Sequence, residues 1–175
     1  PAKKRDTTLI AGLTATTLDQ AFADYTIFLR VVQNDVLLNA QQRLTSLCEA
    51  EAAREKSQQV WKNIGKLSDK YLYNPNSQYR NEEAYLVWTE WVANNSLSDE
   101  NAKRVAKELI PQLSKNRISQ PASNFEFALK NGKKMQLSDV EAQYTILLFS
   151  NPGCADCRNT IETLSSIVAI EGLLA

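Results

Sequence analysis

The spacing of apolar residues changes near residue 114, and this change limits the possible folds more than any other feature. Between residues 17 and 113 apolar residues recur every three or four positions, which predicts helices. After Pro121 they alternate with polar or small residues, which predicts strands. The polar stretch 114–121 between these patterns is typical of a linker. We therefore predict an α+β chain, with an all-α domain over residues 1–113, a linker at 114–121 and a second domain over 122–175.

The first domain is expected to contain four or five helices with short connections. The predicted helices start at Thr17 and at Asp35, run over 51–72, start again at Asn81, and run from Ser98 to Ile110. Thr17 and Gln20 have the spacing of a capping box, in which each side chain satisfies a free backbone N–H. Pro111 is expected to end or kink the last helix, because proline lacks the N–H that an interior helical residue donates.

Composition excludes several classes of function. Twenty basic and twenty acidic residues cancel, which removes the main electrostatic argument for a nucleic-acid partner. The chain has no histidine, so it cannot form a Ser-His-Asp or Cys-His catalytic arrangement. Its three cysteines cannot complete a four-cysteine zinc site. No run approaches the roughly 18 apolar residues of a membrane-spanning helix. We expect no cofactor, no metal and no transmembrane segment in this chain.

The second domain opens with a predicted β-hairpin. Phe125, Phe127 and Leu129 alternate with polar or small residues, and a similar alternation follows the Asn131-Gly132 pair. Asn-Gly between two alternating runs is typical of a type I′ turn, which needs positive φ at both central residues. Residues 138–141 then have the form of a capping box and predict one short helical turn.

Residues 144–168 carry the chain's candidate chemistry. Residues 144–150 have an apolar centre, ILLF, and predict a buried central strand. Asn-Pro-Gly at 151–153 predicts a sharp turn, after which a helix begins at the Cys-Ala-Asp-Cys motif. Its expected inner face carries Cys157, Ile161, Leu164 and Val168.

The two cysteines of this motif have the spacing of a redox pair. Cys154 is predicted at the helix N-terminus, where free N–H groups favour a thiolate, so it is the candidate nucleophile. Cys157 is the candidate resolver of the mixed disulfide. Asp156 opposes the thiolate, since a nearby negative charge disfavours it. A structural disulfide or a metal site are the alternatives for such a pair. Cys48 is most simply a small core residue, with a regulatory or pairing thiol as its alternative.

Two segments resemble a known family. Asn124-Phe125, the Asn131-Gly132-Lys133 hairpin, residues 137–139 and the CxxC motif look like the opening of bacterial extracytoplasmic thioredoxin-like proteins. Residues 71–77, YLYNPNS, followed by RNEE at 80–83, look like the helical domain of unknown function that precedes this domain in Bacteroides-type proteins. The resemblance implies an exported, possibly lipid-anchored cell-envelope protein. It also implies thiol-disulfide exchange with protein thiols and disulfides at Cys154 and Cys157.

The chain departs from this family in two respects. Gly153 replaces the tryptophan that commonly precedes the first cysteine. Only residues 122–175 follow the linker, whereas a complete thioredoxin-like domain has about 100 residues. The resemblance therefore implies a truncated domain, without the partner strands and the cis-proline loop, and we expect this chain to be inactive by itself.

A different function is a non-catalytic protein-interaction module, with the thioredoxin-like part as scaffold. Tyr85, Trp88 and Trp91 lie on one predicted helix, where they form either a ligand-stacking wall or a packed core face. A solvent-exposed patch formed by all three would favour the interaction module, whereas complete burial of all three would remove its main motive.

Overall fold

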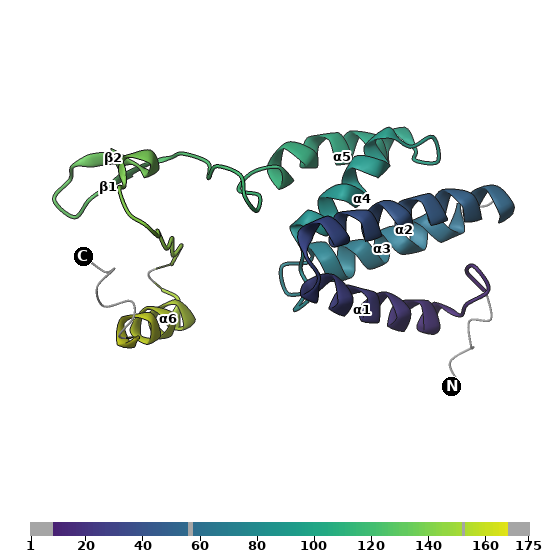
Figure 1. Ribbon diagram of the computed structural model, residues 1–175, viewed down its shortest axis with the longest axis horizontal. Helices are drawn as coiled ribbons and strands as arrows, with labels where there is room; N and C mark the ends of the chain where they lie inside the picture. The colour runs from purple at the N-terminus through teal and green to yellow at the C-terminus, as the bar shows by residue number, and fades with distance from the viewer. Residues whose placement is uncertain (1–8, 56–57, 152, 168–175) are drawn as a thin grey trace. The chain divides into compact units, whose positions relative to one another are not determined.

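A computed structural model describes residues 9–55, 58–151 and 153–167. The chain divides between Ser123 and Asn124 into two compact units, each considered by itself (Figure 1). Val168, predicted on the inner face of the last helix, lies outside the described residues.

The first unit begins with two long helices, α1 (Ala15–Val31) and α2 (Asn34–Glu55). The N-cap of α1 is Thr14, whose Oγ1 accepts the backbone N–H of Thr17 at 3.2 Å. The predicted cap at Thr17 is therefore wrong by three residues. Thr17 is itself helical, and its hydroxyl bonds instead to the Thr14 hydroxyl at 2.8 Å.

The predicted helix over 51–72 is also wrong, because its first residues belong to α2. Cys48 and Ala52 are buried one turn apart and continue a single inner face of α2, on which Gln41 and Thr45 are buried too. A new helix, α3 (Gln59–Ser68), then runs directly into a π-helical turn, η1 (Asp69–Tyr73). Because some residues on the inner face of α2 are polar, the spacing of apolar residues alone did not predict one continuous helix there.

Helices α4 (Glu82–Asn94) and α5 (Glu100–Leu113) complete the unit. The predicted helix starts at Asn81 and in the 98–100 segment are confirmed. The Asn81 side chain accepts the N–H of Ala84 at 3.0 Å, and the Asp99 side chain accepts the N–H of Ala102 at 2.8 Å.

Pro111 does not end α5, the first of its two predicted effects, because the helix continues to Leu113. Leu113 is buried, and the backbone N–H and the hydroxyl of Ser114 both donate to the carbonyl of Ile110. Packing and these bonds hold the last turn despite the missing proline N–H.

The core of this unit is built around α4, which packs against α2 and α5 (Figure 1). Leu29, Leu72 and Leu86 are almost completely buried. A polar contact crosses the core: buried Gln41 accepts the Tyr25 hydroxyl at 2.9 Å and donates to the Ala84 carbonyl at 2.6 Å. This one side chain therefore ties α1, α2 and α4 together.

The start of the predicted linker is bonded to the helical unit. Arg117 donates twice to one carboxylate oxygen of Glu83, at 3.0 and 2.5 Å, and the backbone N–H of Ile118 donates to the other at 3.3 Å. Residues 117 and 118 are therefore fixed against the N-terminal turn of α4.

The second unit opens with the predicted hairpin, which is confirmed. Strands β1 (Glu126–Ala128) and β2 (Lys134–Gln136) are antiparallel, with Phe127 opposite Met135. The type I′ turn is wrong: of the Asn-Gly pair only Gly132 has positive φ, at +82°. Leu129 and Lys133 are joined by a 2.8 Å hydrogen bond, which leaves a three-residue loop closed by glycine, a common alternative hairpin connection.

A single 3-10 turn, η2 (Leu137–Asp139), follows β2. Its N-cap is Gln136 rather than the predicted Ser138, and the Asp139 side chain accepts the N–H of Gln136 at 2.8 Å. The predicted capping box therefore forms two residues earlier in the chain.

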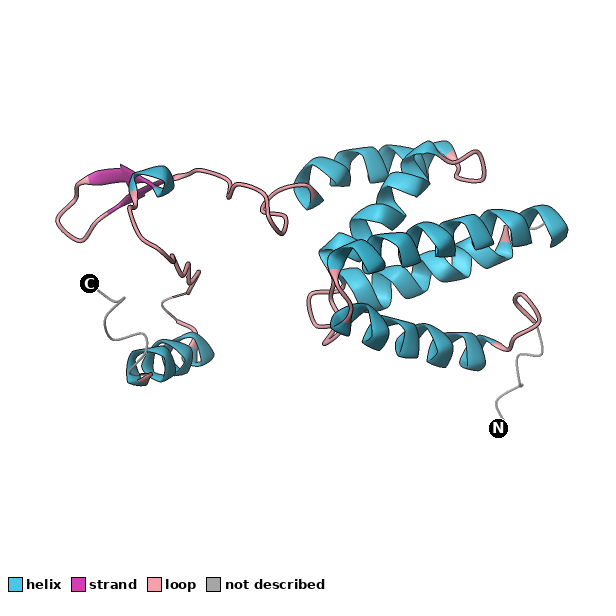
Figure 2. Ribbon diagram, viewed as in Figure 1, coloured by secondary structure: helices cyan, strands magenta, loops and turns pink. Residues whose placement is uncertain are grey.

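Residues 144–150 are not a strand, although one was predicted (Figure 2). A strand needs a hydrogen-bonded neighbour, and no described segment pairs with these residues. Ile146 and Phe149 are 58% and 79% exposed. The predicted final helix does form, as α6 (Ala155–Ser166).

Candidate functional site

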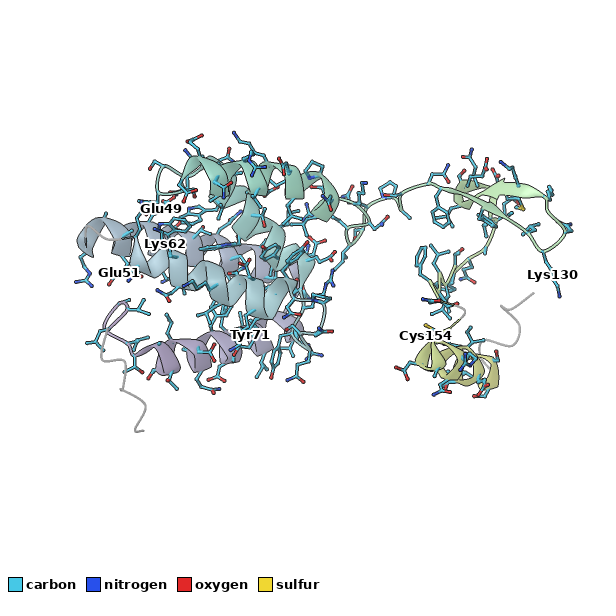
Figure 3. All side chains as sticks on the ribbon, turned by 180° about the vertical axis from the view of Figure 1, so that it is seen from behind. Glu49, Glu51, Lys62, Tyr71, Lys130 and Cys154 are labelled. Atoms are coloured by element: carbon cyan, nitrogen blue, oxygen red, sulfur yellow. The ribbon has the colours of Figure 1, made fainter. Side chains whose placement is uncertain are left out.

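Cys154 lies at the N-cap of α6, the position predicted for it (Figure 3). Its Sγ accepts the backbone N–H of Cys157 at 3.2 Å. The preceding turn sets this position: the N–H of Cys154 donates to the Asn151 carbonyl at 2.9 Å, and the Asn151 side chain accepts the N–H of Gly153 at 3.2 Å. These two bonds of Asn151 hold Cys154 where its sulfur accepts an N–H of the first helical turn.

Both cysteines of the motif are free thiols with partly exposed side chains. Cys48 is different, since it is 2% exposed in the core, and burial followed by the charge of Glu49 raises its pKa to about 12. The interpretation of Cys48 as a core residue is confirmed. Reagents in solution therefore reach Cys154 and Cys157 far more readily than Cys48.

The surroundings of Cys154 favour its thiolate. Hydrogen bonds from the Cys157 thiol and then from the Cys157 backbone N–H lower the pKa of Cys154 below its ordinary value. Partial desolvation raises it, and the backbone N–H of Asp156 lowers it. The sequence left open whether the Asp156 charge or the helix terminus dominates. In the structure the pKa is lowered, because the Cys157 thiol and then the backbone N–H groups donate hydrogen bonds to the sulfur.

The described residues contain no group of three or more Cys, Asp or Glu side chains placed to hold a metal ion. None of the described helices is long and apolar enough to cross a membrane.

The aromatic residues of α4 do not form an exposed patch. Tyr85 and Trp88 are 7% and 4% exposed, whereas Trp91 is partly exposed. The Tyr85 hydroxyl donates to Asp69 at 2.7 Å, and the Trp91 indole N–H donates to Glu49 at 2.7 Å. The core interpretation is confirmed for Tyr85 and Trp88, but Trp91 remains partly exposed, so the complete burial that would remove the motive for the interaction module applies to two of the three residues.

The sequence did not indicate a groove that lies between α3 and α5 with α4 as its floor. Its cavity volume is about 440 Å³. Gln59, Lys62 and Lys66 of α3 and Asp69, the first residue of η1, follow one another at three- and four-residue spacing, but polar residues at that spacing are also typical of a solvated helix face.

Comparison with known proteins places the first unit in a family. The sequence model of a domain of unknown function, DUF5106, matches residues 3–116. The chain belongs to the DUF5106 family. This match includes the helical unit and the residues 71–77 and 80–83 on which the predicted resemblance rested.

A similar solved structure extends the comparison beyond this domain. The crystal structure of a thioredoxin-like protein from Bacteroides caccae, at 1.90 Å resolution, is 33% identical with a TM-score of 0.78. The match covers 90% of this DUF5106 chain and 55% of that chain. The chain thus spans about half the length of this relative. No curated protein matches the sequence.

These matches confirm the predicted resemblance and fold class. The chain combines a helical domain of unknown function with a partial thioredoxin-like unit, and it is similar over 90% of its length to a Bacteroides thioredoxin-like protein. Within that unit, the hairpin, the turn and α6 are formed, whereas residues 144–150 lack a partner strand among the described residues.

Proposed function

We propose that this protein exchanges disulfides with other proteins through Cys154 and Cys157. The observation that carries the proposal is the position of Cys154 at the N-cap of α6, where its sulfur accepts the N–H of Cys157 at 3.2 Å and the second thiol lies within the first helical turn. An exposed thiolate and a nearby resolving thiol are the two groups that exchange requires.

The exchange begins from the reduced pair. The Cys154 thiolate attacks one sulfur of a substrate disulfide, which breaks the S–S bond and releases one substrate thiolate. Cys157 then loses its proton and attacks the Cys154 sulfur of the mixed disulfide, which releases the second substrate thiolate. The substrate gains two electrons, and Cys154 and Cys157 become a disulfide. A dithiol reductant returns this pair to the reduced state.

The fold and the thiol environment support this function. The similar Bacteroides caccae protein is thioredoxin-like, and the lowered pKa of Cys154 raises the thiolate fraction near neutral pH. We place the activity in the cell envelope, as the family resemblance implies, and cell fractionation with an antibody to the native protein tests this location.

We also propose that the 175-residue chain turns over slowly by itself. Ile146, Leu147, Leu148 and Phe149 are between 44% and 79% exposed, whereas a thioredoxin-like central strand would bury them. The support that such a strand gives to the CxxC turn is therefore weak. Equilibrium chemistry of the two thiols is a better test than a turnover rate.

The test is a redox titration of the full chain in glutathione buffers, with the Cys154–Cys157 disulfide measured by mass spectrometry after acid quenching. We expect one reversible two-electron transition, which Cys154→Ser abolishes and Cys48→Ala leaves unchanged. A pair that stays reduced across the glutathione range, or that forms a disulfide which glutathione and dithiothreitol cannot reduce, contradicts the proposal. The second outcome would instead indicate a structural disulfide.

A further inference from the structure

The groove between α3 and α5 combines an apolar interior with a basic edge. Its floor is the α4 face that carries Trp88, Thr89 and Val92. Helix α5 supplies a small-residue and aliphatic wall of Ala102, Val105, Ala106 and Leu109. The opposite wall, from α3, is polar. The cavity volume of about 440 Å³ falls in the range of small-molecule sites.

Lys62 and Lys66 give the groove its charge. They lie one helical turn apart on the α3 wall, and Figure 3 shows Lys62 on this helical unit. Neither lysine forms an ion pair with any described residue. Asp69, the acidic residue of the same wall, accepts the Tyr85 hydroxyl at 2.7 Å. The lining of the groove thus carries two ammonium groups and one carboxylate, so its edge has a net positive charge that attracts an anion.

The apolar part of the groove is incompletely covered. Val105 is 47% exposed although it lies beside the buried Ala106 and Trp88. The backbone of α3 comes close to the Trp88 indole at Gly65, where a Cβ would already be in van der Waals contact with the ring at 3.4 Å. An apolar ligand that lies against Val105 would remove this surface from water.

Trp61 also lines the groove and is only 7% exposed, and its indole N–H is buried without a hydrogen-bond acceptor within the described structure. Because this nitrogen is itself enclosed, Trp61 contributes apolar ring surface to the groove and no donor to a ligand.

We propose that this groove binds a small anionic amphiphile, a carboxylate with an apolar body of medium chain length. The carboxylate lies between Lys62 and Lys66, and the apolar body lies over Trp88 and against Val105. The site belongs to the DUF5106 domain and is independent of the cysteine pair.

The test uses the three tryptophans, which are all in the helical unit and two of which line the groove. Tryptophan fluorescence of the full chain is titrated with decanoate, 1-decanol and decyltrimethylammonium, each below its solubility or micelle limit. We expect saturable binding of decanoate, weaker binding of the alcohol and the weakest binding of the cation.

Two variants locate the site, and each has a matched control. The double variant Lys62→Gln, Lys66→Gln should bind decanoate about tenfold more weakly, because the binding free energy of two partly solvated ion pairs is lost. Its affinity for decanol should be unchanged. The control is Lys115→Gln, another exposed lysine of the unit. Val105→Asp should abolish binding of both ligands, whereas Val36→Asp, at a valine of similar exposure on α2 (42% against 47%), should not.

Far-UV circular dichroism of all variants verifies the helical fold. The proposal is overturned if decanoate does not bind saturably or binds no better than the cation. It is also overturned if Val105→Asp, with its helical signal intact, binds decanoate like Val36→Asp.

Discussion

Gln41 is the residue whose replacement tests the helical core most sharply. Its side chain is 1% exposed and makes two hydrogen bonds, from the Tyr25 hydroxyl and to the Ala84 carbonyl. Gln41→Leu keeps most of the volume and removes both bonds. The Tyr25 hydroxyl then loses its acceptor. This hydroxyl is largely buried, which raises its pKa. The Ala84 carbonyl loses a second donor but stays within α4.

The expected cost of Gln41→Leu is about 2 kcal/mol of unfolding free energy, because one partly buried donor is left unpaired and one helical carbonyl loses an additional bond. At a urea m-value of about 2 kcal/mol/M, the midpoint falls by about 1 M. Tryptophan fluorescence is the appropriate probe, since Trp61, Trp88 and Trp91 all report on this unit.

Gln42→Leu is the matched control, at the exposed neighbouring position of α2, and should shift stability by less than about 0.5 kcal/mol. Tyr25→Phe combined with Gln41→Leu should cost about 1 kcal/mol less than the sum of the single changes, because the two side chains contact each other. Equal midpoints for Gln41→Leu and Gln42→Leu, or strictly additive costs, would refute the reasoning.

Three further changes test other parts of the molecule. The pH midpoint of Cys154 alkylation by iodoacetamide should lie below that of an ordinary thiol and rise in Cys157→Ala, which removes the thiol hydrogen bond; an unchanged midpoint would contradict the hydrogen-bond account. Hydrogen bonding from Arg117 lowers the pKa of Glu83, so its stabilising effect is complete above the ordinary value of 4.5 and is lost as the pH falls through the lowered pKa. Glu83→Gln should therefore reduce the melting temperature by about 3 °C at pH 7 and by progressively less as the pH falls below 4.5 and through the lowered pKa, with a pH-independent loss as the contrary result. Gly132→Ala should weaken the hairpin by about 1 kcal/mol, since a Cβ there meets no atom and only the positive φ opposes it; unchanged NMR contacts between Phe127 and Met135 would contradict this.

Local signals in the sequence predicted the local structure well. Asn81 and the 98–100 segment start helices because their side chains accept nearby N–H groups, and such bonds need no distant partner. The Cys154 position followed in the same way from the turn before α6. The N-cap of α1 was predicted at the wrong residue because Thr14 and Thr17 are both of a type that caps helices. The sequence alone does not show at which of the two the backbone becomes helical.

Structure that depends on distant residues was predicted less well. The apolar run at 144–150 has the composition of a strand, but composition does not supply the neighbouring strand to which its backbone would bond. The groove was missed for a related reason. Lys62 and Lys66 appear in the sequence as a solvated helix face, and only the packing of α4 and α5 places an apolar surface beside them.

Mixed-disulfide trapping tests the central claim, that Cys154 attacks and Cys157 resolves, most directly. Reduced Cys157→Ser and Cys154→Ser variants, each also carrying Cys48→Ala, are mixed with a peptide disulfide at pH 7 and quenched with acid. We predict that Cys157→Ser accumulates a stable peptide adduct on Cys154, whereas Cys154→Ser accumulates at least tenfold less at the same time. Equal adduct formation on the two variants, or faster formation on Cys157, would contradict the assignment.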